Sequence, residues 1–250
     1  MRWREREGVP WLEAEIGNGA RAAFSTRLGG VSEPPFDSLN LGVLTDDAEE
    51  AVVENRGRLA TALELDAARI PIGLQVHGAN LARHDSPQPA RPFARPGSDL
   101  PNVDGHVVSA AGLAPLVLVA DCLPVALSGP GGVAILHCGW RGLAAGIVAS
   151  GAEAVGATDA AIGPGIGPCC YEVGEEVLGA FAQLGGGIAN GGMLDLPEVA
   201  RRLLEGAGVE RVESAGLCTS CESELFFSHR RDGARTGRQA GLAWIGPGVG

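Results

Sequence analysis

The chain has 250 residues, and its 30 acidic residues outnumber its 19 basic residues to give a formal net charge of −11. All 19 basic residues are arginine, which excludes a Schiff-base lysine, a P-loop and a protein kinase with its usual strand lysine. The negative charge argues against nucleic acid or an anionic membrane as the main partner. Any bound phosphate must therefore be held by arginine, by backbone N–H groups or by a metal ion.

The predicted location follows from the absence of targeting and membrane signals. The N-terminal stretch MRWREREGVPWLEAE has no apolar core of a secretory signal, and the longest apolar run, 110–120, is too short to span a bilayer. We therefore expect a cytoplasmic protein. In a reducing compartment its six cysteines are expected to be thiols or metal ligands rather than disulfides.

In the first half of the chain, periodicity and turn residues predict strands separated by loops. A helix is expected from Asp46 or Asp47, as its cap, to about Leu65. Residues 25–35, rich in glycine, proline and serine, are predicted to be a loop, and residues 85–102, with five prolines and no periodicity, an exposed loop. Strands are predicted over 21–25, 70–76 (ending at His77), 103–109 and 115–120.

The second half opens with a strand, turn, strand and helix between residues 122 and 156. The turn is so short that the two strands must be antiparallel. Further on, the sequence predicts a strand leading into a Gly/Pro loop at 160–167, helices at 174–184 and 197–207, and strands and hairpins over 209–245. This mixture favours a single α+β domain over residues 1–250 rather than alternating βαβ units.

The predicted hairpin places Cys122 and His137 on one side of its sheet. A two-residue turn at Gly129 and Pro130 pairs Cys122 directly with His137, whereas a four-residue GPGG turn pairs Pro124 with His137. The second register makes Cys122 a diagonal neighbour on the same face. In both registers Cys138 points to the opposite face, so we expect it to be buried and inert.

A cysteine beside a histidine has two chemical uses. The pair can act as nucleophile and base, or it can hold a metal ion with one further ligand, leaving a position open for water or substrate. His77, which is followed by a glycine, is the best candidate for that ligand, but spacing alone leaves its role open. We interpret the other histidines, His84, His106 and His229, as packing or surface residues.

The remaining cysteines give a weaker signal. Cys218 and Cys221 form a C-x-x-C motif, but a structural zinc site needs a second pair, and the adjacent Cys169 and Cys170 make an awkward one. We therefore interpret these four as ordinary thiols.

Five stretches of the chain resemble one family. They are FSTRLGGVS (24–32), LQVHG (74–78), ADCLPV (120–125) with HCGWRGL (137–143), IGPGIGPCCYEVG (162–174) and CTSCESELFFSHRRDGARTGR (218–238). Together they resemble the YfiH/laccase-domain family, known both as polyphenol oxidases and as purine nucleoside phosphorylases. The resemblance implies an α/β/β/α layered sandwich, similar to the cysteine-hydrolase toxin-like fold. It also implies a catalytic metal site at His77, Cys122 and His137. The chain departs from the family at Cys138 and His229, where alanine and tyrosine are usual, and Cys221 is not a residue associated with the family.

By the same resemblance, the expected activity is zinc-dependent phosphorolysis of adenosine, inosine, guanosine and methylthioadenosine, together with deamination of adenosine. The partners are then a purine nucleoside and phosphate, and copper is possible in the same metal site. Without lysine, phosphate binding must involve arginine, for which we favour Arg27 and Arg141 over the Arg230/Arg231 pair. Asn40, Gln75 and Asp104 match family motif positions and are expected to contact sugar, base or a metal ligand.

Three other functions remain as alternatives. A metal-free Cys122–His137 pair would make a thiol hydrolase. The family resemblance adds a related alternative, an enzyme that edits amino acids on peptidoglycan precursors in the cytoplasm. A non-catalytic binding module with a structural metal is disfavoured by three ligands with an open position. A copper polyphenol oxidase is disfavoured because a multicopper oxidase needs more histidines than the five in this chain.

Overall fold

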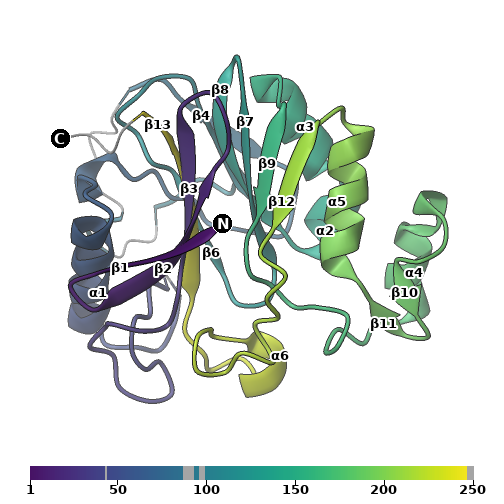
Figure 1. Cartoon of the computed structure of the whole chain (residues 1–250). Helices are drawn as coiled ribbons and strands as arrows, with labels where there is room; N and C mark the ends of the chain where they lie inside the picture. Colours follow the sequence, from purple (N-terminus) through teal and green to yellow (C-terminus); the bar gives the residue numbers. More distant parts are fainter. Residues whose placement is uncertain (43, 87–92, 96–98, 247–250) are drawn as a thin grey trace.

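Two β-sheets pack face to face, and helices cover both outer faces (Figure 1). The computed structural model describes residues 1–42, 44–86, 93–95 and 99–246. The five-stranded sheet has the order β1 (Arg2–Arg6), β2 (Val9–Glu15), β3 (Ala20–Ser25), β13 (Gln239–Ile245) and β6 (Leu116–Val119). The six-stranded sheet has the order β12 (Arg211–Ser214), β9 (Asp159–Ile162), β7 (Leu123–Gly129), β8 (Gly132–Cys138), β5 (Gly105–Val108) and β4 (Leu81–His84).

Helices and short strands complete the described part of the chain. α1 (Glu49–Ala62) lies against the five-stranded sheet, and α3 (Ile147–Val155) and α5 (Leu196–Gly206) lie against the six-stranded sheet (Figure 1). The shorter elements are α2 (Trp140–Ala144), α4 (Glu175–Ala180), α6 (His229–Asp232), the 3₁₀ turns Ala67–Arg69 and Ala182–Leu184, and the strand pair β10 (Ala189–Asn190) and β11 (Met193–Leu194).

Three apolar cores lie between the four layers. Leu59 of α1 packs with Trp11 and Leu242 of the five-stranded sheet. Between the sheets, alanines and branched residues such as Ala126 and Ile135 fill a thin core. The outer face of the six-stranded sheet packs on α3 and α5. The α+β class and the α/β/β/α sandwich predicted from the sequence are thereby confirmed.

Several predicted elements have different bounds or do not form. The predicted strand at 70–76 is wrong, because this segment makes only an isolated bridge between Leu74 and Asn102. Neither aspartate caps α1: its N-cap is Ala48, with no side-chain cap. The long helix predicted after β8 breaks into α2 and α3 at Gly146, whose φ of 86° is left-handed. The predicted hairpins near the C-terminus are absent from the described residues, where β12 instead pairs in parallel with β9.

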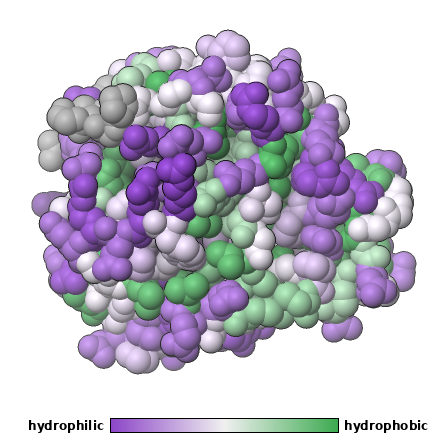
Figure 2. Space-filling model, in the orientation of Figure 1, coloured by the Kyte–Doolittle hydropathy of each residue, from purple (hydrophilic) through white to green (hydrophobic). Residues whose placement is uncertain are grey.

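The surface agrees with the composition. On the face shown in Figure 2, hydrophilic side chains cover much of the upper part, and apolar residues gather across the lower part of the view. The predicted exposed loop 85–102 falls partly outside the described residues, and its Phe93 is fully buried against α1 and the five-stranded sheet. Among the described residues, no helix combines the length and apolarity needed to cross a bilayer.

Candidate metal and substrate site

One pocket of about 540 Å³ gathers most of the polar residues singled out by the sequence. Its wall includes His77, Cys122 and His137, together with Gln75 and Arg141. The volume suits a small-molecule ligand. Its lining comes from the end of β6 and the segment that leads into β7, from the end of β8, from α2 and from the start of α6, so the junction of the two sheets builds the site.

The β7–β8 hairpin brings Cys122 to His137 in the second of the two predicted registers. Pro124 pairs with His137 and Gly129 with Gly132, so the GPGG turn is confirmed. Cys122 lies one residue before β7 and is a diagonal neighbour of His137 on the same face. Cys138 points the other way, into the core under α3, where it is fully buried as expected.

Asp104 anchors both histidines from a fully buried position. One carboxylate oxygen lies 2.8 Å from His137 Nδ1 and also accepts the backbone N–H of His77 at 2.8 Å. The other oxygen accepts the N–H of Gly78 at 2.8 Å and of Val76 at 3.2 Å. These bonds hold His77 in the left-handed region, at a φ of 61°. Desolvation opposes ionisation of Asp104, but the hydrogen bonds from His137, Gly78 and Val76 outweigh it and lower the pKa of the carboxyl.

The Cys122 thiol and the His137 imidazole stabilise each other's charge in the metal-free protein. Desolvation raises the pKa of Cys122, but the charge of His137 and hydrogen bonds with both histidines lower it overall to about 6. Desolvation likewise opposes protonation of His137, but Cys122 and Asp104 raise its pKa to about 9. With Asp104 behind the histidine, the arrangement is also that of a nucleophile, a base and a group that orients the base.

The same three residues fit a metal ion. The donor atoms of His77, Cys122 and His137 all lie within 4.8 Å of one another, and the two imidazole rings meet edge to face with their centroids 4.8 Å apart. Two imidazoles and a thiolate suit zinc, and the carboxylate behind His137 is the outer partner that metal-binding histidines usually have. The site therefore brings together the ligand set that sequence spacing alone left incomplete.

Asp121, which sequence reasoning did not select, organises the opposite wall of the pocket. Its φ of 91° is left-handed. Its buried carboxylate accepts the hydroxyl of Thr219 at 2.7 Å and the backbone N–H of Arg230 at 2.6 Å. Asp121 directly precedes Cys122, so its strained backbone conformation helps to set the position of the Cys122 side chain. An aspartate next to a predicted ligand was the only sequence signal that pointed to it.

Three arginines line the pocket, and only one of them was preferred from the sequence. Arg141 stacks on Trp140, with its guanidinium carbon 4.4 Å from the ring centroid. The guanidinium carbon of Arg230 lies 5.2 Å from the ring centroid of Tyr171. The backbone N–H of Arg238 donates to the side-chain oxygen of Asn40. Arg238 is half-buried, and desolvation lowers its pKa.

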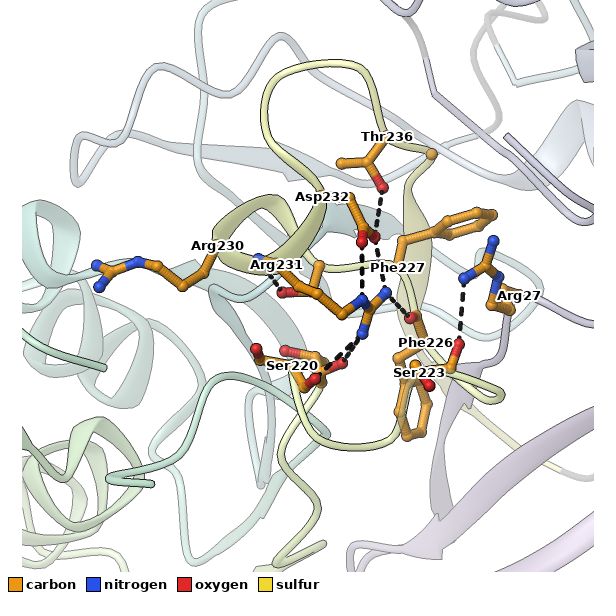
Figure 3. Close-up of polar contacts among 12 residues, drawn as sticks. Arg27, Ser220, Ser223, Phe226, Phe227, Arg230, Arg231, Asp232 and Thr236 are labelled. Carbon is orange, nitrogen blue, oxygen red and sulfur yellow. Dashed lines mark hydrogen bonds and ion pairs between the residues drawn. The ribbon is translucent and has the colours of Figure 1, made fainter. Parts of the chain in front are cut away.

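Arg27 and Arg231 are occupied elsewhere (Figure 3). Arg27 pairs with Asp37 at 3.1 Å, donates to Ser223 O at 3.1 Å and stacks on Phe227, and it does not line the pocket. Arg231 donates to the carbonyls of Thr219 and Phe226 and pairs with Asp232. Figure 3 shows Arg230 extending away from this network. The structure thus surrounds the Arg27 guanidinium with protein groups outside the pocket lining, and its expected contact with substrate stays a prediction.

The other two motif residues are satisfied by protein groups. Asn40 is fully buried, donates to Asp47 at 2.8 Å and accepts the N–H of Arg238 at 2.9 Å, so it fixes a pocket residue from behind. The Gln75 amide exchanges two hydrogen bonds with the backbone of Leu118, at 2.7 and 2.8 Å, although Gln75 also lines the pocket. Among the remaining histidines, His84 and His106 pair in the core at 2.9 Å, whereas His229 lies in the pocket wall.

Comparison with known proteins gives one consistent family. A family model described as multi-copper polyphenol oxidoreductase laccase matches residues 21–246. The purine nucleoside phosphorylase YlmD of Geobacillus stearothermophilus is 39% identical over 268 residues, covering 97% of this chain and 96% of its own. The purine nucleoside phosphorylase YfiH of Escherichia coli is 38% identical over 243 residues, covering 91% of this chain and 94% of its own. The crystal structure of the hypothetical protein YfiH of Bacillus licheniformis superposes with a TM-score of 0.86 at 35% identity, covering 97% and 98% of the two chains.

Proposed function

We propose that this chain, which belongs to the multi-copper polyphenol oxidoreductase laccase family, is a metal-dependent purine nucleoside phosphorylase. The proposal rests on one observation above all: a His–Cys–His cluster and three arginines face the same pocket. Relatives at 38–39% identity bear the name purine nucleoside phosphorylase, which supports the same reading. The proposed substrates are adenosine, inosine, guanosine and methylthioadenosine.

The arginines would bind the inorganic phosphate. In phosphorolysis a phosphate oxygen forms a bond to C1′ of the ribose, the C1′–N bond to the base breaks, and the base takes up a proton. Arg141, Arg230 and Arg238 carry the positive charge that phosphate needs, and guanidinium groups bind its oxygens as planar forks. The stacked arrangement of Arg141 on Trp140 restricts its motion, which would favour a fixed phosphate position.

The metal ligands would be His77, Cys122 and His137. A zinc ion held there would supply a Lewis acid to polarise an oxygen of the reacting groups. The protein's own part is to keep His137 in one ring orientation through Asp104 and to hold His77 against the same carboxylate. Adenosine deamination, which releases ammonia and inosine, is proposed for the same pocket.

The first test is product analysis. Zinc-loaded protein incubated with adenosine and phosphate should release adenine and ribose 1-phosphate, and without phosphate should release inosine and ammonia if the deaminase proposal holds. His77→Ala should lose the zinc ion bound at His77, Cys122 and His137, and phosphorolysis with it. Full phosphorolysis in that variant would exclude a role for this metal site.

The arginines can be separated from one another by kinetics. Arg141→Gln and Arg230→Gln should raise the KM for phosphate, each by about tenfold or more, because each removes a charge-assisted contact worth roughly 1.5–3 kcal/mol. Arg27→Gln is the matched control: it should leave the KM for phosphate unchanged and lower thermal stability, since Arg27 bonds only to protein groups and lies outside the pocket. The reverse pattern would restore Arg27 as the phosphate ligand.

The Cys122–His137–Asp104 arrangement favours one second candidate, a thiol hydrolase. The lowered pKa of Cys122 and the hydrogen bond behind His137 suit a cysteine nucleophile, and editing of peptidoglycan precursors would belong to this class. Such an enzyme would keep its activity in a chelator and lose it on alkylation of Cys122. The phosphorylase would lose its activity in the chelator.

Copper polyphenol oxidation is the weakest alternative. The chain has five histidines, of which His84 and His106 bond to each other in the core, so too few remain for a multicopper cluster. Copper bound in place of zinc at His77, Cys122 and His137 is compatible with the ligand chemistry. Measured oxidation of a phenol by copper-loaded protein at a rate comparable to phosphorolysis would contradict this ranking.

A further inference from the structure

A second cluster of cysteines lies beside the pocket. The sulfur atoms of four cysteines lie within 4.8 Å of one another, although two come from residues near 170 and two from residues near 220; they are Cys169, Cys170, Cys218 and Cys221. Cys221 Sγ lies 3.3 Å from Cys169 Sγ and 3.4 Å from Cys170 Sγ. The adjacent pair that appeared awkward in the sequence thus meets the C-x-x-C motif in space.

The geometry points to a structural zinc site in which these four cysteines bind one zinc ion. Zinc–sulfur bonds of about 2.3 Å in a tetrahedron separate neighbouring sulfur atoms by about 3.8 Å. The sulfur–sulfur separations in the cluster, which include 3.3 and 3.4 Å and do not exceed 4.8 Å, lie around that value. A disulfide requires about 2.05 Å between sulfurs, well below both measured separations. Four thiolates with no oxygen or nitrogen donor are the typical ligand set of structural zinc.

Backbone hydrogen bonds close the two segments that carry the cysteines into turns. The N–H of Gly167 donates to Cys218 Sγ at 3.3 Å, which stabilises a thiolate there. Cys221 and Glu222 both donate their N–H groups to the carbonyl of Cys218, at 3.1 and 3.0 Å, so the C-x-x-C segment is a closed turn. Cys170 and Tyr171 both donate to the carbonyl of Gly167, each at 3.1 Å, and form a second closed turn.

A metal at this place would fasten two loops that build the pocket wall. Cys170 directly precedes Tyr171, which lines the pocket, and Cys218 precedes Thr219, which bonds to the carboxylate of Asp121. Only one short bridge, between Gly165 and Cys218, joins the two loops as strands do. Closing a loop of roughly 50 residues with a metal removes much conformational freedom from the unfolded chain. The site does not depend on the proposed phosphorylase activity.

Metal stoichiometry in the full chain tests the proposal. In the His77→Ala variant, where the His–Cys–His site is disabled, protein purified under reducing conditions and loaded with zinc should still hold about one zinc per chain. Zinc X-ray absorption should then show four sulfurs near 2.3 Å. Absence of zinc, a first shell containing nitrogen or oxygen, or iron in its place would overturn the proposal, and this test requires no cysteine substitution to fold.

Cysteine variants give a second measurement. Cys169→Ser with Cys221→Ser in the His77→Ala background should reduce the zinc content from about one to nearly none, whereas Cys138→Ala, a cysteine in neither cluster, should leave it unchanged. Zinc should slow amide hydrogen exchange of residues 167–171 and 218–222 at least tenfold in His77→Ala. Mass spectrometry that finds a Cys169–Cys221 or Cys170–Cys221 disulfide in the freshly reduced, zinc-treated protein would overturn the proposal.

Discussion

Asp104 is the described residue that contributes most hydrogen bonds to the geometry of the proposed metal site. Its two carboxylate oxygens accept four hydrogen bonds, three from consecutive backbone N–H groups around His77 and one from the ring of His137. A residue that lies outside the ligand set thereby orients two of the three ligands. The sequence pointed to Asp104 only through its match to a family motif position, because the residues to which it bonds lie 26 to 33 residues away.

Asp104→Asn should weaken zinc binding by about 10- to 100-fold, because an amide cannot accept all four hydrogen bonds. The measurement is competition for zinc against a calibrated chelator. Asp85→Asn is the matched control. Asp85 is an exposed aspartate directly after β4, and its carboxylate accepts a hydrogen bond from the hydroxyl of Ser109. Equal zinc affinity in Asp104→Asn and the wild type would contradict the anchoring role.

The buried pair His84–His106 should make the protein sensitive to acid. Desolvation, together with the charge of His84, lowers the pKa of His106 to about 3 against an opposing effect of Asp104, and desolvation lowers that of His84 against an opposing effect of Asp85. Both pKa values lie below those of the unfolded chain. The neutral pair therefore stabilises the fold above about pH 6.5, and this contribution is lost as the pH falls toward 3.

For His106 alone, the expected loss in the free energy of unfolding between pH 7 and pH 5 is about 2 kcal/mol. Urea unfolding of wild type and His106→Asn, both in a chelator so that metal loss does not contribute, measures the difference. The wild type should lose more stability than the variant over this range. If the free energy of unfolding fell equally with pH in the wild type and in His106→Asn, His106 would not be the cause of the acid sensitivity.

At the scale of elements, the junction of β8 and α2 determines how closely the ligands approach. Gly139 lies between the strand that carries His137 and the helix that carries Arg141. A Cβ atom at this position would lie 2.9 Å from Cys122 Sγ and 3.2 Å from a ring carbon of His77. Any residue can adopt the backbone conformation of Gly139, with φ −79° and ψ 166°. Glycine is needed here only because a side chain would collide with Cys122 and His77.

Gly139→Ala should therefore fold and yet bind zinc at least tenfold more weakly, because the methyl group displaces the thiol. Gly174→Ala offers a closely matched control: Gly174 is also a helix N-cap, with φ −86° and ψ 173°, and a Cβ there meets nothing within 4 Å. Zinc titration compares the zinc affinities of the two variants, and circular dichroism checks that both are folded. A Gly139→Ala variant with normal zinc affinity would show that the ligands tolerate the extra atom.

Sequence patterns predicted the elements whose signals are local. The β7–β8 hairpin was predictable because its turn residues and apolar runs fix the register to two alternatives, and the helix near residue 200 because its apolar face is regular. The segment before His77 was misread as a strand: its apolar residues pack under α1 and beside β6 without a strand partner. The N-terminal hairpin β1–β2 was missed because its charged residues alternate on an exposed edge.

The site was predictable only in part for the same physical reason. The ligand set followed from a resemblance, and the pairing of Cys122 with His137 from the hairpin. The pocket arginines 230 and 238 were not distinguished from Arg27, because which guanidinium lines the pocket depends on contacts between distant segments. The clustering of the two cysteine pairs was not predictable for the same reason, because they lie about 50 residues apart in the sequence and come together only in the folded structure.

For the whole molecule, the three cores share their strands and should unfold together. In β7, Leu127 belongs to the core under α3 while Ala126 belongs to the core between the sheets. In β3, Ala22 faces the other sheet and Ala23 faces α1. Loss of either sheet exposes two cores at once, which predicts a cooperative transition.

Equilibrium urea unfolding of the metal-free protein should therefore give coincident transitions by tryptophan fluorescence and by far-UV circular dichroism. Trp11 and Trp244 report on the core under α1, while the dichroism signal averages over all elements. Two separated midpoints would show that the helical layers unfold independently. The negative net charge should make the transition midpoint rise with salt, because screening reduces self-repulsion.

The place of β13 between β3 and the edge strand β6 of the five-stranded sheet has a consequence for synthesis. Its neighbours β3 and β6 end at Ser25 and Val119, but the strand that joins them begins only at Gln239. While the ribosome makes the intervening residues, both neighbours present an unpaired edge, and Leu118 and Val119 have no fixed place in the pocket wall. The site is therefore assembled only after translation reaches β13, and a chain that stalls between His137 and Gln239 has all three proposed ligands of the His–Cys–His site but an incomplete pocket.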